Sequence, residues 1–140
     1  MLRSFWALAV LLGLLVGVGE SRAERIAGGY HGFAGKVCNA VAGCVLVFPK
    51  LPTTPATVII YSASCNIEGS GPPPYKVYLS TGLEGAAEIY MPISFIGQSA
   101  TKNAYAGFVS GMEMAVPGGT IMRIFINFGA VTDITAKCSL

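Results

Sequence analysis

The stretch TVIIYSASC, residues 57–65, decides the fold expected of this 140-residue chain. Its β-branched and aromatic residues follow one another without a helical period, which is typical of a strand at the centre of a sheet. The stretch ends in a cysteine, as does the last apolar run of the chain, residues 131–138. We expect this run and residues 120–128 to be its partners, so that the three runs form the inner strands of an exported β-domain.

Four further runs are predicted to be strands, at residues 44–48, 76–80, 87–95 and 104–116. Proline and glycine signals separate them, and no convincing amphipathic helix occurs. Pro92 cannot donate to a β-ladder, so the strand that contains it should lie at an edge or carry a bulge near that residue. About seven strands predict an all-β antiparallel sandwich, of jelly-roll or Ig-like type, and a small β-barrel is the alternative.

The last two runs alternate in a way that assigns their faces. In residues 120–128, one face holds Met122, Ile124, Ile126 and Phe128, and the other holds Ile121, Arg123, Phe125 and Asn127. Because successive side chains of a strand point to opposite faces, the first set should face the core. In the last run, Ile134, Ala136 and Cys138 share a face in the same way.

The beginning of the chain has the parts of a secretory signal peptide. Arg3 gives a positive start, residues 5–18 are apolar, and Ser21 and Ala23 are small residues at positions −3 and −1 of a cleavage site after Ala23. The apolar run is shorter than the roughly 20 residues of a membrane-spanning helix. We therefore expect cleavage, and no stable membrane span.

The expected domain organisation is a signal peptide over residues 1–23 and a single β-sandwich domain over residues 24–140, secreted or periplasmic. The only tryptophan, Trp6, lies in the leader. The exported protein should consequently lack indole fluorescence.

Four cysteines, Cys38, Cys44, Cys65 and Cys138, follow the leader. An even number in an exported chain favours two disulfides, for which three connectivities exist. We favour Cys38–Cys44, which closes a short loop, and Cys65–Cys138, which ties the central strand to the last one and stabilises by about 4 kcal/mol in the chain-entropy model. The spacing does not match the paired ligands of a structural zinc site, and a catalytic thiol would have to stay reduced outside the cytoplasm.

The charge content excludes some partners. Charged residues are 11% of the sequence and the formal net charge is +2, with the charges scattered along the chain. Such a chain lacks the basic patch of a nucleic-acid-binding protein. A charge-poor surface suits contact with another subunit, with a cell-surface layer or with a neutral ligand.

Two segments rich in glycine or proline attract functional interpretation. Residues 29–36 have a glycine spacing that does not match a phosphate loop, and Val37 stands where Ser or Thr would bind magnesium, so no nucleotide or other cofactor is expected. A flexible arm or an edge hairpin explains the glycines. Residues 66–74 end in three prolines and are predicted to form a stiff exposed loop, either a contact surface or a simple connection.

Catalytic and metal-binding patterns are weak. His31 lies in the glycine-rich segment without a local nucleophile motif, and nothing in the sequence gathers metal ligands around it. Glu84 and Glu88 are the candidate carboxylate pair of a small hydrolase, but the sequence does not fix their separation. We therefore expect no enzyme activity and no metal site.

Binding remains as the expected role. Tyr75, Tyr78 and Tyr90 are predicted on loops or outward faces, where a ring with a polar tip can stack on a carbohydrate or anchor a protein. The alternative is that these rings cover the edges of the core. An edge strand could also pair with a second copy of the chain and give a homo-oligomer.

The sequence thus predicts a small exported non-enzymatic protein, a binding or structural module of the cell envelope or extracellular space. An exported inhibitor or ligand-binding domain, for a carbohydrate or a protein, is the second hypothesis. A small hydrolase is the third.

Overall fold

The computed structural model describes residues 19–26, 29–38, 43–129 and 133–140. Within these ranges all regular elements are strands, and all strand pairs are antiparallel. Residues 1–18, which include Trp6 and most of the predicted leader, lie outside the described residues. In the described part of the chain there is no helix long and apolar enough to cross a membrane.

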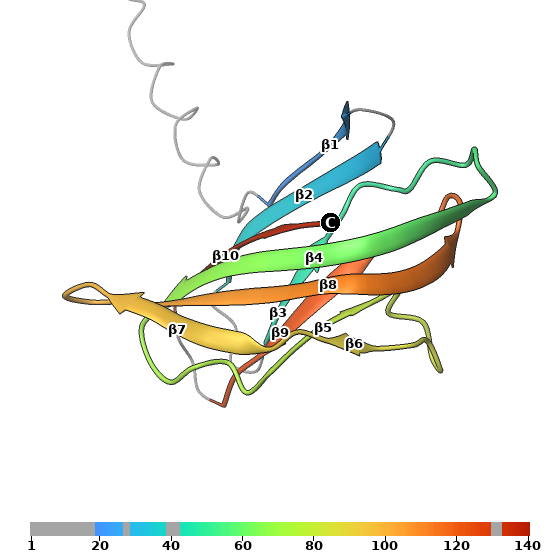
Figure 1. Ribbon diagram of the computed structural model, residues 1–140. Helices are drawn as coiled ribbons and strands as arrows, with labels where there is room; N and C mark the ends of the chain where they lie inside the picture. Colours follow the sequence, from blue (N-terminus) through green and yellow to red (C-terminus); the bar gives the residue numbers. More distant parts are fainter. Residues whose placement is uncertain (1–18, 27–28, 39–42, 130–132) are drawn as a thin grey trace, which may run out of the picture.

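The larger sheet has six strands in the order β1-β2-β10-β4-β8-β7. It occupies the front of the molecule in Figure 1. Its strands are β1 (Glu20–Ile26), β2 (Gly29–Cys38), β4 (Thr57–Gly69), β7 (Ile93–Gln98), β8 (Asn103–Pro117) and β10 (Ile134–Ser139).

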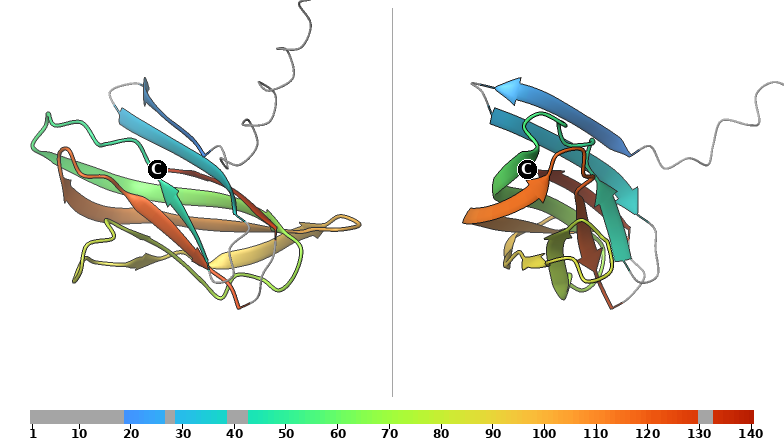
Figure 2. Two further views of the ribbon diagram at one scale, coloured as in Figure 1. Left: turned by 180° about the vertical axis from the view of Figure 1, so that it is seen from behind. Right: turned by 90° about the vertical axis from the view of Figure 1, so that its right-hand side faces the viewer.

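The smaller sheet has four strands in the order β3-β9-β5-β6. It lies behind the larger sheet in Figure 1 and comes to the front in the reverse view of Figure 2. Its strands are β3 (Gly43–Val47), β5 (Lys76–Ser80), β6 (Ile89–Tyr90) and β9 (Arg123–Asn127).

One hydrophobic core lies between the two sheets. The alternation of β9 buries Ile124 and Ile126 completely, and Met122 and Phe128 beside the strand are at most 2% exposed. The opposing sheet contributes inward residues of β4, β8 and β10, among them Ile67, which is also fully buried. The face assignments predicted for the last two runs are therefore confirmed.

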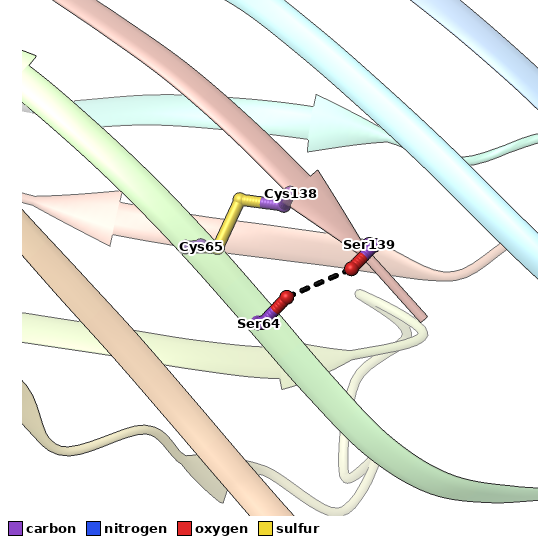
Figure 3. The surroundings of a disulfide bond; sticks show 4 residues. All are labelled: Ser64, Cys65, Cys138 and Ser139. Atoms are coloured by element: carbon purple, nitrogen blue, oxygen red, sulfur yellow. Dashed lines mark hydrogen bonds between the residues drawn. A yellow bond between two sulfur atoms is a disulfide. The ribbon is translucent and has the colours of Figure 1, made fainter.

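Both disulfides have the predicted pairing. Cys65 and Cys138 are direct cross-strand partners on β4 and β10, with Cα atoms 4.1 Å apart. The next residues along these strands, Ser64 and Ser139, point to the opposite face, where their hydroxyl oxygens are 2.8 Å apart (Figure 3). Cys38 and Cys44 join the end of β2 to the start of β3, and so link the two sheets.

The pairing of β4 differs from the sequence expectation. The last strand, β10, is its neighbour as predicted, but residues 120–128 are not. Their strand β9 belongs to the other sheet, and β8 is the second neighbour of β4. β9 instead turns Ile124 and Ile126 into the core that it shares with β4, an arrangement that the alternation of β9 allows equally well.

Strand lengths and number also differ. β4 continues to Gly69, because Asn66 and Glu68 alternate with buried Ile67 and both neighbouring strands pair with this extension. The run predicted at residues 87–95 divides at Pro92 into β6 and β7, which are edge strands of different sheets. This division and the hairpin of β1 and β2 bring the count within the described residues to ten strands, where the sequence predicts about seven.

The glycine-rich segment is the edge hairpin of β1 and β2. Gly32 shows why a side chain is missing there, since an added Cβ would lie 3.1 Å from the Tyr30 ring and 3.3 Å from Phe48. The hydroxyl of Tyr30 donates to the carbonyl oxygen of Pro49 at 3.2 Å, and partial burial raises the pKa of this tyrosine. The hairpin is thus anchored to the core by aromatic packing over a glycine.

Candidate functional site

Three aromatic residues cross the outer face of the smaller sheet. Phe125 of β9 and Tyr90 of β6 are the cross-strand partners of Tyr78 of β5, on either side of it. The rings of Tyr78 and Phe125 are stacked, with centroids 4.9 Å apart and an interplanar angle of 7°. The rings of Tyr78 and Tyr90 are tilted, with centroids 6.1 Å apart. We call these three residues the aromatic row.

A charged pair lies against the aromatic row. The ammonium nitrogen of Lys76 is 3.0 Å from Oε2 of Glu88, and the hydroxyl of Tyr90 donates to the same oxygen at 2.7 Å. The ammonium also lies 4.4 Å from the ring centroid of Tyr78 and 4.9 Å from that of Tyr90, within the range of a cation–π contact. Lys76, Glu88 and Tyr90 therefore form a connected surface cluster.

These contacts favour the charged forms of both partners. The Tyr90 hydroxyl, and after it the Lys76 ammonium, lower the pKa of the Glu88 carboxyl. The Tyr90 hydroxyl and then the Glu88 carboxylate raise the pKa of Lys76 above its ordinary value. At neutral pH the cluster consequently presents one positive and one negative charge beside the rings.

Neighbouring groups cover part of the ring faces in the row. Phe125 stacks on Tyr78 from one side, and Tyr90 flanks it on the other. Tyr90, at the edge of the sheet, is 57% exposed. This arrangement offers aromatic edges with polar tips beside a charged pair, whereas a sugar-stacking platform would offer flat, open rings.

An open hollow of about 590 Å³ adjoins the row, at the start of β5 and beside the segment that joins β6 to β7. Its lining includes Pro74, Tyr75, Tyr90 and Pro92. Tyr75 is 70% exposed, and its backbone N–H donates to the carbonyl oxygen of Asn127 at 3.0 Å, which fixes the backbone beneath the ring. The predicted trio therefore comes together, with Tyr78 and Tyr90 in the row and Tyr75 across the hollow.

Other residues of this face have to be added to the trio. The side chain of Arg123 donates to the carbonyl oxygen of Thr81 and so holds the turn after β5 against the sheet. Gly82 in that turn has a φ of 75°, and an added Cβ would lie 3.2 Å from the ring of Phe125. The alternation of residues 120–128 indicated that Arg123 and Phe125 face outward, but only the pairing of β9 with β5 shows that they belong with Tyr78.

The remaining candidates lie apart or in other roles. His31 is on β2 of the larger sheet, whereas Glu84 is exposed in the turn after β5 and Glu88 is engaged with Lys76 and Tyr90. The structure does not bring His31 to the two carboxylates, which belong to the side of the molecule formed by the smaller sheet. Among the described residues, no group of three or more histidine, cysteine, aspartate or glutamate side chains could hold a metal ion.

The predicted loop of residues 66–74 is shorter than expected, because its first residues extend β4. The amide nitrogen of Asn103 donates to the carbonyl oxygen of Gly71 at 3.3 Å, which ties the remaining turn to β8. Pro74 at its end lines the hollow beside Tyr75. Of the predicted loop, only this end therefore contributes to the candidate site.

The fold and the site define an all-β protein with two antiparallel sheets, two disulfides and an exposed aromatic face. No known family, curated protein or solved structure matches the chain.

Proposed function

We propose that this chain is a small exported non-enzymatic binding module, whose aromatic row and adjoining charged pair form the contact surface for a protein partner. The fold we infer is a β-sandwich of jelly-roll or Ig-like type, since its strand pairs fall into two separate sheets. The two disulfides are compatible with the oxidising environment of a secreted or periplasmic protein. Export removes an N-terminal leader, for which the sequence alone predicts cleavage near Ala23.

The aromatic row carries the proposal. Protein contact surfaces are enriched in tyrosine, phenylalanine and arginine, and their strongest residues are rings that already have a fixed position. Stacking on Phe125 and bonding to Glu88 fix Tyr78 and Tyr90 before any partner arrives, which lowers the entropic cost of binding. The charge of the Lys76–Glu88 pair would set the orientation of the partner more than the affinity.

The test compares two faces of the same protein. The double variant Tyr78→Ser/Tyr90→Ser alters the row, and Phe108→Ser alters a ring that is 58% exposed on the larger sheet. Each immobilised domain is exposed to an extracellular or envelope extract from its source. We expect one retained protein to be lost with the row variant and kept with the Phe108 variant.

Equal retention by both variants would contradict the proposal. Folding of each variant is checked by its urea transition, so that loss of binding is not confused with loss of structure. The assignment as a non-enzymatic module is challenged separately: an activity found for the purified domain and abolished by Glu88→Gln or His31→Ala would favour the hydrolase hypothesis.

A carbohydrate ligand is the second candidate, and the hollow beside Tyr75 favours it. Tyr75 is the most exposed of the three predicted tyrosines and has no ring partner among the described aromatic contacts, so its faces are open to a sugar. Binding on a glycan array that Tyr75→Ala abolishes and Tyr78→Ser leaves intact would select this candidate over a protein partner.

A structural module would self-associate. Light scattering coupled to size exclusion, across a range of concentrations and with disulfides intact, separates the two roles. We expect a monomer; a stable oligomer would favour the structural role and direct attention to the edge strands β6 and β7 near Pro92.

A further inference from the structure

The first strand of the larger sheet includes residues that the sequence assigns to the leader. β1 runs from Glu20 to Ile26 and pairs with β2 along its whole length, from Glu20 opposite Gly35 to Ile26 opposite Gly29. Cleavage after Ala23 would remove the first four of its seven residues. The cleavage site and the fold are therefore in conflict.

The backbone of β2 shows what those four residues do. Gly32 exchanges hydrogen bonds with Leu140, at 3.2 and 2.9 Å, so its peptide groups point toward the β10 side. Along an antiparallel strand, the backbone N–H and C=O groups of successive residues point to opposite neighbouring strands. Those of Phe33 and Gly35 therefore point toward β1. Their partners are Arg22 and Glu20. Without residues 20–23, the N–H and C=O groups of Phe33 and Gly35 would form an unpaired edge.

Side chains of the same segment pack on the sheet. The guanidinium of Arg22 lies 5.1 Å from the ring centroid of Phe33, in cation–π contact. Glu20 and Arg22 line one hollow of about 520 Å³ together with Phe33 and Lys137 of β2 and β10. Residues 20–22 thus make the contacts of a strand of the folded domain, and these contacts would be lost if the residues were removed with the leader.

The sequence offers a second cleavage site that spares β1. Gly17 and Gly19 are small residues at positions −3 and −1 of the Gly19–Glu20 bond, and they directly follow the apolar run. A cut there leaves Glu20, the first residue of β1, as the new N-terminus. Both sites satisfy the small-residue requirement, and only this one keeps the ladder of β1 and β2 complete.

We propose that the leader peptidase hydrolyses the Gly19–Glu20 bond, so that the mature protein begins at Glu20 and closes the edge of β2 with its own N-terminal strand. Water adds across this peptide bond, leaving a carboxylate on Gly19 and an amino group on Glu20. The inference rests on the export of the chain, which is part of the proposed function.

The test is the N-terminal sequence and intact mass of the protein exported by a secretory host that expresses the full chain. We expect a single mature species that begins at Glu20. A species that begins at Glu24 overturns this inference and leaves export intact. An exported product that keeps the leader, recognised by the indole emission of Trp6, overturns the cleavage site, and a chain that stays inside the cell overturns export.

Two matched variants sharpen the result. A large residue at position −1 blocks a leader peptidase, so Gly19→Leu should change or prevent the cut, and Ala23→Leu should leave the Glu20 terminus unchanged. A cut that Ala23→Leu blocks and Gly19→Leu leaves unchanged overturns the inference. Ala23 is exposed in β1, so leucine there does not disturb the core.

Amide hydrogen exchange independently tests the pairing of residues 20–23 with β2. In purified protein comprising residues 20–140, the amides of Phe33 and Gly35 should exchange at least about tenfold more slowly than in protein comprising residues 24–140, because open edge amides exchange from the folded state. Equal exchange rates would show that residues 20–23 do not pair with β2 and would overturn the inference.

Discussion

The two sheets share one core but differ sharply in their outer faces. The outer face of the smaller sheet carries Phe125, Tyr78 and Tyr90 in contact with one another and with a charged pair. The larger sheet carries the hydroxyl pair Ser64 and Ser139 on its outer face, and its exposed rings Tyr61 and Phe108 make no ring–ring contact among the described residues. The two faces therefore differ less in the exposure of their aromatic residues than in the contacts that hold the rings.

The predictions that follow test this contrast, beginning with the shared core. The disulfide Cys65–Cys138 lies wholly within the larger sheet. Replacing both cysteines by alanine should lower the free energy of unfolding by about 4 kcal/mol, since the closed loop is long. Because one core serves both sheets, they should still unfold in a single urea transition.

The matched control replaces Cys38 and Cys44, which are six residues apart. Its expected loss is about 2 kcal/mol, because a short loop constrains the unfolded chain less. Unfolding of each variant is monitored through amide signals of β5 in the smaller sheet and of β10 in the larger sheet. Two separate transitions in either variant would show that the sheets are independent units.

Neighbouring residues of β9 compare the inner and outer faces of one strand. Ile124 is completely buried, so Ile124→Ala should lower the free energy of unfolding by about 2–5 kcal/mol through lost burial and the cavity left behind. Phe125→Ala should lower the free energy of unfolding by less, although it removes a larger side chain, because Phe125 lies on the outer face of the strand. An equal or greater loss for Phe125, measured by urea denaturation, would mean that the aromatic row belongs to the core.

The contrast between the outer faces is tested by Phe125→Ala against Phe108→Ala. Phe125 stacks on Tyr78, whereas the cross-strand partner of Phe108 on β4 is Ser64. Stacked aromatic pairs contribute about 0.5–1.5 kcal/mol beyond area burial, so the first variant should be less stable than the second by about 1 kcal/mol. Indistinguishable urea transitions of the two variants would show that stacking on Tyr78 does not make Phe125 more stabilising than Phe108.

The smallest expected effect concerns pH. The Tyr90 hydroxyl and the Lys76 ammonium lower the pKa of Glu88, so the stabilisation by this cluster is present above the ordinary carboxyl pKa and is lost as pH falls through the lowered value. An NMR titration of the Glu88 carboxyl carbon should give a midpoint below that of an ordinary glutamate.

Replacing Tyr90 by phenylalanine should return this midpoint toward the ordinary value, because the first cause of the shift is removed. Lys76→Met should act in the same direction, because it removes both a hydrogen bond and a neighbouring positive charge. A midpoint that neither variant moves would show that Glu88 is not held by these partners in solution.

Local pattern predicted much of the structure. The β-branched run of residues 57–65, the alternation of β9 and the spacing of the four cysteines depend on neighbours a few residues apart or on the chemistry of one residue type, and these expectations agree with the structure. The tyrosines Tyr78 and Tyr90 were also found from their expected exposure. Their roles as site residues remain predictions.

The errors concern relations between distant segments. The sequence placed residues 120–128 beside β4 in one sheet. An apolar strand face is buried equally well when the strand lies in the opposite sheet and packs across the core, so alternation does not distinguish these arrangements. In the same way, Pro92 indicated an interruption, while the transfer of the chain from one sheet to the other at that point depends on the edges available.

The sequence by itself determined an all-β chain with two disulfides, the inward face of its last two strands and the candidates for its exposed rings, because these follow from side-chain period, residue type and cysteine count. Only the tertiary structure decided that Tyr78 stacks on Phe125, that Glu88 bonds to both Lys76 and Tyr90, and that residues 20–23 pair with β2. These contacts depend on strand order and register, which many distant residues fix together when they bury a common core.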